Sequence, residues 1–123
     1  MPPRRRVPLV EGARALQQWR TDAAAGDVSD RATTATAVRF SLEELALRAP
    51  GRSVEVRVPP FGATQCVAGP THTRGTPPNV IETDAQTWLQ IATGVLGWDE
   101  AGDSGRLRVS GHRADLAPYL PLL

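Results

Sequence analysis

The stretch NVIETDAQTWLQIATGVL at residues 79–96 contains the signals of a strand followed directly by a helix. It begins with two β-branched residues after an asparagine, and these predict the middle of a short strand because branched side chains favour extended backbone. Thr83 and Gln86 have the spacing of a capping box, which predicts a helix start. Apolar residues then recur at helical spacing: Ala85, Trp88, Leu89, Ala92 and Val95. Gly94 predicts the end of this helix.

The residues before this stretch predict a β-hairpin and a loop. Residues 54–58, VEVRV, alternate valine with charged side chains, and this period of two is typical of a strand with one buried face. Two prolines interrupt the pattern, and residues 61–67 predict the returning strand. Residues 69–79 contain three prolines, two glycines and three threonines, so we expect a surface loop there.

Two amphipathic helices are predicted in the N-terminal half. Apolar residues recur every three to four positions over residues 9–26 and again over residues 35–49. A shorter second helix that begins at Ser41, with Ser41 and Glu44 as a capping box, is the alternative. We favour the longer helix because its apolar stripe runs through without a break in phase.

The C-terminal part predicts one more strand and a short helical stretch. Residues 99–105 are polar and predict a turn. Residues 106–110 alternate arginine with leucine and valine, as in a strand with one solvent-exposed face. A helical stretch is expected around residues 115–116, limited by Pro118 and Pro121.

Length, charge and cysteine content narrow the class of protein. The 123 residues suffice for one core, and we expect a flexible basic tail at residues 1–8 and a single domain at residues 9–123. The 14 basic residues nearly balance the 13 acidic ones, so the net charge of +1 argues against nucleic acid as a partner. No apolar run approaches about 18 residues, which argues against stable membrane insertion. The lone Cys66 forms no internal disulfide and favours a cytoplasmic location.

No residue pattern indicates catalysis, a cofactor or a metal. Cys66 and His72 are near enough in sequence for a nucleophile and its base, but no signature of an orienting group or an oxyanion hole accompanies them. Cys66, His72 and His112 lack the short spacing that makes metal-ligand patterns specific. We therefore expect a protein that is not an enzyme, with no cofactor and no metal.

A pattern of glycine and leucine steps follows the strand and helix within residues 79–123. The steps are Gly94 and Leu96, then Ser104, Gly105 and Leu107, then Gly111 and Leu116. In this pattern the chain resembles the sterol carrier protein family. Residues 54–60 and 72–78 are similar to a bacterial sterol-carrier-like branch of actinobacterial type, and the N-terminal half agrees with the family in element order alone.

The resemblance implies an α/β (α+β) fold in which helices cover one face of a mostly antiparallel sheet of about five strands. It also implies an apolar tunnel between sheet and helices, which binds a sterol, a fatty acid or an acyl chain without transforming it. We expect these large apolar residues to line the tunnel: Phe61, Trp88, Leu89, Leu96, Trp98, Leu107, Val109 and Leu120. His72 and Arg74 are candidates for contact with the head group of the ligand.

Several alternatives stay open. Large apolar residues most often fill a core, so a protein-interaction module with the same fold and no tunnel is the second hypothesis. Pro118 and Pro121 interrupt the C-terminal segment, where the family has a continuous helix as a lid. The loop with His72 and Arg74 is alternatively a solvated turn. The sequence also leaves the oligomeric state open, and a homodimer is one state that it allows.

Overall fold

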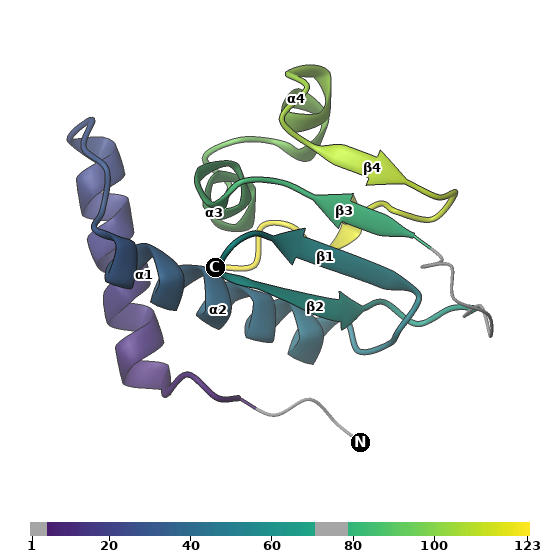
Figure 1. The fold of residues 1–123 in the computed structure, drawn as a ribbon, viewed down its shortest axis with the longest axis horizontal. Helices are drawn as coiled ribbons and strands as arrows, with labels where there is room; N and C mark the ends of the chain where they lie inside the picture. The colour runs from purple at the N-terminus through teal and green to yellow at the C-terminus, as the bar shows by residue number, and fades with distance from the viewer. Residues whose placement is uncertain (1–4, 71–78) are drawn as a thin grey trace.

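Figure 1 shows the computed structural model of the chain, which describes residues 5–70 and 79–123. In these ranges the elements are, in order, α1 (Leu9–Ala24), α2 (Arg31–Arg48), β1 (Val54–Val58), β2 (Gly62–Cys66), β3 (Val80–Glu82), α3 (Ala85–Thr93), α4 (Trp98–Asp103), β4 (Arg108–Ser110) and the 3-10 turn η1 (Ala117–Tyr119). This combination of helices and strands confirms the mixed α and β fold class.

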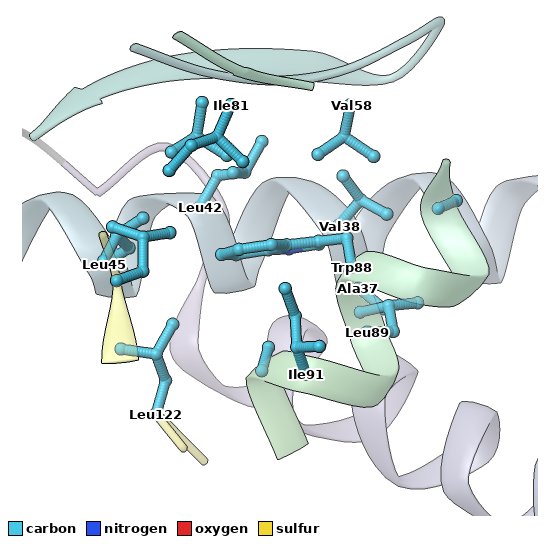
Figure 2. Packing of buried hydrophobic residues seen from close by; sticks show 14 of the residues in the cluster. Ala37, Val38, Leu42, Leu45, Val58, Ile81, Trp88, Leu89, Ile91 and Leu122 are labelled. Atoms are coloured by element: carbon cyan, nitrogen blue, oxygen red, sulfur yellow. The ribbon is translucent and has the colours of Figure 1, made fainter. Parts of the chain in front are cut away.

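The strands form one mixed sheet with the order β2-β1-β3-β4. β1 pairs with β2, and β3 pairs with β4, in the antiparallel direction, whereas β1 and β3 run parallel. Val56 in β1 lies opposite Thr64 of β2 and Ile81 of β3. Helices α2 and α3 lie on one face of this sheet (Figures 1 and 2).

The described residues form four strands, whereas the resemblance implies about five. The expectation of about five strands is therefore wrong for this part of the chain. The residue patterns by themselves indicate four strands, at residues 54–58, 61–67 and 106–110 and around residues 80–81, and the fifth rests on the resemblance alone. Two of the three strand pairings are antiparallel, as expected for a mostly antiparallel sheet.

The opposite face of the sheet carries charged side chains. Glu55 pairs with Arg57 within β1, and a guanidinium nitrogen of Arg108 in β4 lies 3.7 Å from a carboxylate oxygen of Glu82 in β3. Charged side chains are stable in contact with water, so this face does not need a covering helix. The core accordingly forms on the other face, where the valines of β1 are fully buried.

Helix α2 has the longer of the two predicted lengths. Its N-cap is Asp30, whose side chain accepts a 2.7 Å hydrogen bond from the backbone N–H of Thr33 and whose pKa is lowered by this bond. Ser41, the alternative start, lies inside the helix, and its hydroxyl donates to the carbonyls of Ala37 and Val38. The prediction from the unbroken apolar stripe is confirmed.

Helix α3 exists as predicted, but a different residue caps it. Asp84 is the N-cap and accepts a 2.7 Å hydrogen bond from the backbone N–H of Thr87. The hydroxyl of Thr83 donates instead to the carbonyl of Arg106, at 2.8 Å, and so ties β3 to the segment before β4. At the other end Gly94 has a φ of 81°, and this left-handed conformation ends the helix as expected.

A second correction concerns residues 99–105, where the polar sequence predicts a turn. The structure has a short helix there, α4, at Trp98–Asp103. Ala101 is the buried residue of this helix. Since the buried contact is made by one small side chain, the apolar pattern is too weak to predict a helix. The helical stretch expected at residues 115–116 likewise lies slightly later, at Ala117–Tyr119.

The core fills the space between the sheet and helices α2 and α3 (Figure 2). Large side chains that are fully buried in it include Val38, Leu45, Val54, Val56, Val58, Ile81, Trp88, Leu89 and Ile91. The indole of Trp88 lies in the middle of this layer (Figure 2), and its Nε1 donates a 2.8 Å hydrogen bond to the hydroxyl of the buried Ser41. A buried indole N–H requires such a partner, so the bond allows a large aromatic side chain to occupy the centre.

Helix α1 packs against α2 and reaches α3 through one side chain. Trp19 is buried, and its Nε1 donates a 2.9 Å hydrogen bond to Oε1 of Gln86 on α3. Gly12 faces the ring of Phe40 on α2 so closely that a Cβ on this residue would overlap with the ring. Glycine therefore allows the close crossing of the two helices.

The segment before α1 also contacts α2. Arg5 donates a 2.6 Å hydrogen bond to Glu44, and its guanidinium lies 5.2 Å from the centre of the Phe40 ring. The backbone N–H of Val7 donates to Glu43. The predicted tail at residues 1–8 is thus described from Arg5 onward, where these contacts hold it against α2.

Candidate functional site

The space that the resemblance assigns to a tunnel is occupied by side chains. Trp88 and Leu89, two of the predicted lining residues, are 0% exposed in the core, with the Trp88 indole below the sheet and Leu89 farther from the sheet (Figure 2). Interiors of this kind have the density of organic crystals, so a ligand could enter only if these side chains moved. Space that is open to a ligand lies instead at the rim of the core.

A hollow of about 450 Å³ lies where α3, α4 and the C-terminal segment meet. We call it the α3–α4 groove and define it by its lining residues: Ile91, Gly94, Leu96, Gly97, Trp98, Asp99, Glu100, Ala117, Leu120 and Pro121. Its volume lies within the range of about 300–1,000 Å³ that is usual for ligand sites. It is open to solvent, and Leu96, Trp98 and Leu120 in its wall are partly buried.

The chain builds this groove from two stretches of sequence, residues 91–100, which run from the end of α3 into α4, and residues 117–121 of the C-terminal segment. Gly94 reverses the chain after α3, and the N–H of Leu96 then donates a 3.2 Å hydrogen bond to the carbonyl of Gln90. The C-terminal segment returns to α3, where the N–H of Leu122 donates a 2.8 Å hydrogen bond to the carbonyl of Ala92. These backbone bonds hold the residues after Gly94 and the C-terminal segment in place, and both form walls of the groove.

Gly94 also determines how closely the C-terminal segment approaches. A Cβ built on Gly94 would lie 3.3 Å from the Cβ of Pro121, which is tighter than an ordinary contact. The absence of a side chain at this position therefore lets Pro121 form one wall of the groove. Leu122 is buried beside it and anchors the segment in the core.

The structure brings some of the predicted ligand-binding residues together and separates others. Leu96, Trp98 and Leu120 line the α3–α4 groove. Trp88 and Leu89 lie in the core, and Leu107 is partly buried against it. Val109 is 48% exposed on the edge strand β4. The predicted head-group contacts His72 and Arg74 lie outside the described residues.

Phe61, the remaining predicted residue, borders a different hollow. This hollow of about 250 Å³ lies between β2, α2 and the segment before α1, and Leu42 and Val7 also line it. The guanidinium of Arg31 lies 5.4 Å from the centre of the Phe61 ring, and the side chain of Arg39 donates a 3.0 Å hydrogen bond to the Phe61 carbonyl. Phe61 is therefore held by α2, apart from the residues of the α3–α4 groove.

Several groove residues have no counterpart among the predicted ones. Ile91 belongs to the apolar stripe of α3, but Ala117, Pro121, Asp99 and Glu100 carry no local signal of a binding site. They lie in two stretches of sequence, residues 91–100 and 117–121, and only the packing of these stretches shows that they line one surface.

Cys66 is buried in β2 and has the properties of a structural thiol. It is 0% exposed, and burial raises its pKa from 9.0 to about 12. A buried group is easier to keep neutral than charged, so the nucleophilic thiolate is disfavoured. The described residues also contain no group of three or more His, Cys, Asp or Glu side chains that could hold a metal ion.

We expect Cys66 to react very slowly with a thiol reagent while the protein is folded. A rise of the pKa from 9.0 to about 12 lowers the thiolate fraction near neutral pH by about a thousand-fold. Labelling with an aromatic disulfide at pH 8 should thus be slow in buffer and fast in denaturant. The folded-state pKa exceeds the unfolded one, so the stability that this thiol contributes is present below pH 9 and is lost as the pH rises towards 12. Rapid labelling of the native protein would contradict this assignment.

Within residues 5–70 and 79–123, no helix is long and apolar enough to cross a membrane. This agrees with the absence of a long apolar run in the sequence.

Comparison with known proteins shows to which family the chain belongs. No curated protein matches the chain. A family model described as "Bacterial SCP ortholog" matches residues 30–122, from the N-cap of α2 to the C-terminal segment. The matched region contains the whole sheet, helices α2 to α4 and the α3–α4 groove, while α1 lies before it. The chain therefore belongs to the bacterial SCP ortholog family, the sterol-carrier-like group that the pattern in residues 79–123 resembles.

Proposed function

We propose that the protein binds a small apolar ligand, of the sterol or acyl-chain type, in the α3–α4 groove and does not transform it. The observation that supports this most directly is the apolar wall of the groove, in which Leu96, Trp98 and Leu120 meet around a hollow of about 450 Å³. Membership of a sterol-carrier-like family agrees with a carrier role. The function proposed needs no cofactor, and burial of the apolar part of the ligand supplies the affinity.

The open shape of the groove sets the expected strength of binding. Full burial of a methylene group contributes about 0.8 kcal/mol, and an open groove covers only part of each group. For a ten-carbon chain we therefore expect a Kd on the order of 100 µM. Larger ligands that cover more of the wall should bind more tightly.

Two measurements test this function. Native mass spectrometry of protein purified without delipidation should show a bound lipid at a stoichiometry near one, which solvent extraction then identifies. Calorimetric titration with 1-decanol should give saturable binding, and tryptophan emission should shift to shorter wavelength because Trp98 is partly exposed while Trp19 and Trp88 are buried. Without a co-purifying lipid and without a response to 1-decanol, the proposed function fails.

A pair of variants locates the binding. Trp98→Ala should weaken 1-decanol binding by about ten-fold or more, because the indole provides a large part of the apolar wall. Val95→Ala is the matched control, since Val95 is 70% exposed beside the groove and does not line it. Equal losses in the two variants would place the ligand elsewhere.

The filled interior favours a second candidate function, a protein-interaction module. Trp88 and Ile81 are fully buried in the core below the sheet, and this filled interior supports a fold that binds no ligand there. In this case the groove would be part of a contact surface for a macromolecule. This candidate predicts a protein free of lipid that does not bind 1-decanol, which is the opposite of the expected result above.

A further inference from the structure

The α3–α4 groove has an acidic rim. Asp99 and Glu100 are in the first turn of α4, are exposed, and line the hollow together with the apolar residues. None of the described residues that line the groove is basic. A ligand in the groove therefore meets apolar side chains in the wall and two negative charges at the edge.

These two carboxylates are not neutralised by neighbouring side chains. The ion pairs of the described residues involve Glu44, Glu55 and Glu82, and neither Asp99 nor Glu100 takes part in one. The hydrogen bonds between described residues do not engage their side chains either. The negative potential at this rim is thus available to a ligand.

The geometry of α4 keeps one carboxylate at the groove. A Cβ built on Gly97, the N-cap of α4, would lie 3.4 Å from Oε1 of Glu100. The Glu100 side chain therefore turns back towards the start of the helix, where Gly97 and Trp98 form part of the groove wall. Asp103 is on the same helix but does not line the groove.

We propose that the α3–α4 groove prefers amphiphiles with a positively charged head, such as long-chain amines, over amphiphiles of equal chain length with a carboxylate head. This inference rests on the proposed function and narrows its ligand class, because a free fatty acid would place its charge beside Asp99 and Glu100. An alkyl chain would lie along Leu96, Trp98 and Leu120, and the ammonium group would lie at the acidic rim.

The size of the preference follows from the exposure of the charges. One exposed pair of opposite charges strengthens association by about two- to five-fold, and salt screens it. With two carboxylates we expect an amine head to bind about three- to ten-fold more tightly than a neutral alcohol head. A carboxylate head should be weaker than the alcohol by a similar factor because like charges repel.

The test compares decylamine, 1-decanol and decanoate, which share one chain length, by calorimetric titration at pH 7.5 and low salt. Affinity should fall in the order amine, alcohol, carboxylate, and the differences should shrink at 0.5 M sodium chloride. In Asp99→Asn/Glu100→Gln the three ligands should bind with nearly equal affinity. Asp103→Asn is the matched control, since it removes one charge of α4 outside the groove and should keep most of the preference.

The possible outcomes separate this inference from the function on which it rests. If 1-decanol binds at the groove but the three head groups do not differ, or decanoate binds best, the preference is refuted and the proposed function stands. If none of the three ligands binds and no lipid co-purifies, the function itself fails. If the preference persists in Asp99→Asn/Glu100→Gln, the amine binds elsewhere. A dimer in sedimentation that Leu120→Ala converts to a monomer would show that a second copy covers the groove, which also overturns the proposal.

Discussion

Replacing Trp88 with alanine is expected to lower the free energy of unfolding by about 3–5 kcal/mol, the usual cost of removing a large aromatic side chain from a core. Trp88 is 0% exposed and lies in the middle of the core, with Val38 of α2 beside it and the sheet above it (Figure 2), so neighbouring side chains can close only part of the space. The substitution also removes the hydrogen bond to Ser41. Urea unfolding followed by circular dichroism measures the effect.

Two further variants serve as comparisons for Trp88→Ala. Trp88→Phe keeps most of the volume and loses the N–H donor, so we expect a smaller cost, about 1–2 kcal/mol. Val95→Ala should change stability by less than about 0.5 kcal/mol because Val95 is 70% exposed. A cost below about 1 kcal/mol for Trp88→Ala would mean that the interior is loosely packed. The space beneath the sheet would then be a rival to the α3–α4 groove as the ligand site.

Gly12→Ala is expected to destabilise the protein by about 1–3 kcal/mol, although alanine normally favours a helix over glycine. A Cβ at this position would overlap with the Phe40 ring, so α1 or the ring must move. Gly102→Ala is the matched control, because Gly102 is in helix α4 and a Cβ there has no neighbour within 4 Å. We expect that control to be neutral or stabilising by up to about 1 kcal/mol.

A double-mutant cycle assigns the effect of Gly12→Ala to the ring. In a Phe40→Ala background the added methyl group has space, so Gly12→Ala should no longer destabilise the protein. An unchanged cost in that background would refute the steric explanation. Because α1 lies before the matched residues 30–122, the cycle also tests whether this helix unfolds together with the family domain. The indole of Trp19 on α1 reports its unfolding by fluorescence.

Much of the fold follows from patterns between residues that are close in sequence. The period of two at residues 54–58 predicts β1, and the apolar stripe at residues 35–49 predicts the long α2. The helix that begins after Asp84 and ends at Gly94 is likewise present. These predictions succeed because the burial of a side chain on an amphipathic element depends on its spacing along that element.

The predictions failed where the local pattern was weak or two residues competed for one role. Helix α4 buries a single alanine, Ala101, so its sequence looks like a turn. Thr83 and Asp84 are both good N-caps, and the bond from Thr83 to Arg106 decides between them. That bond joins residues far apart in sequence, which local spacing does not reveal.

The candidate site depended most on tertiary structure. The sequence by itself determined that Trp88, Leu89, Leu96, Trp98 and Leu120 are apolar and therefore mostly buried in some way. Only the packing of α3, α4 and the C-terminal segment decided that the first two fill the core and the other three line a groove. The physical reason is that a core and an apolar pocket are lined by the same types of side chain. Which of them meets a ligand depends on where segments distant in sequence leave space, and on where Asp99 and Glu100 border that space.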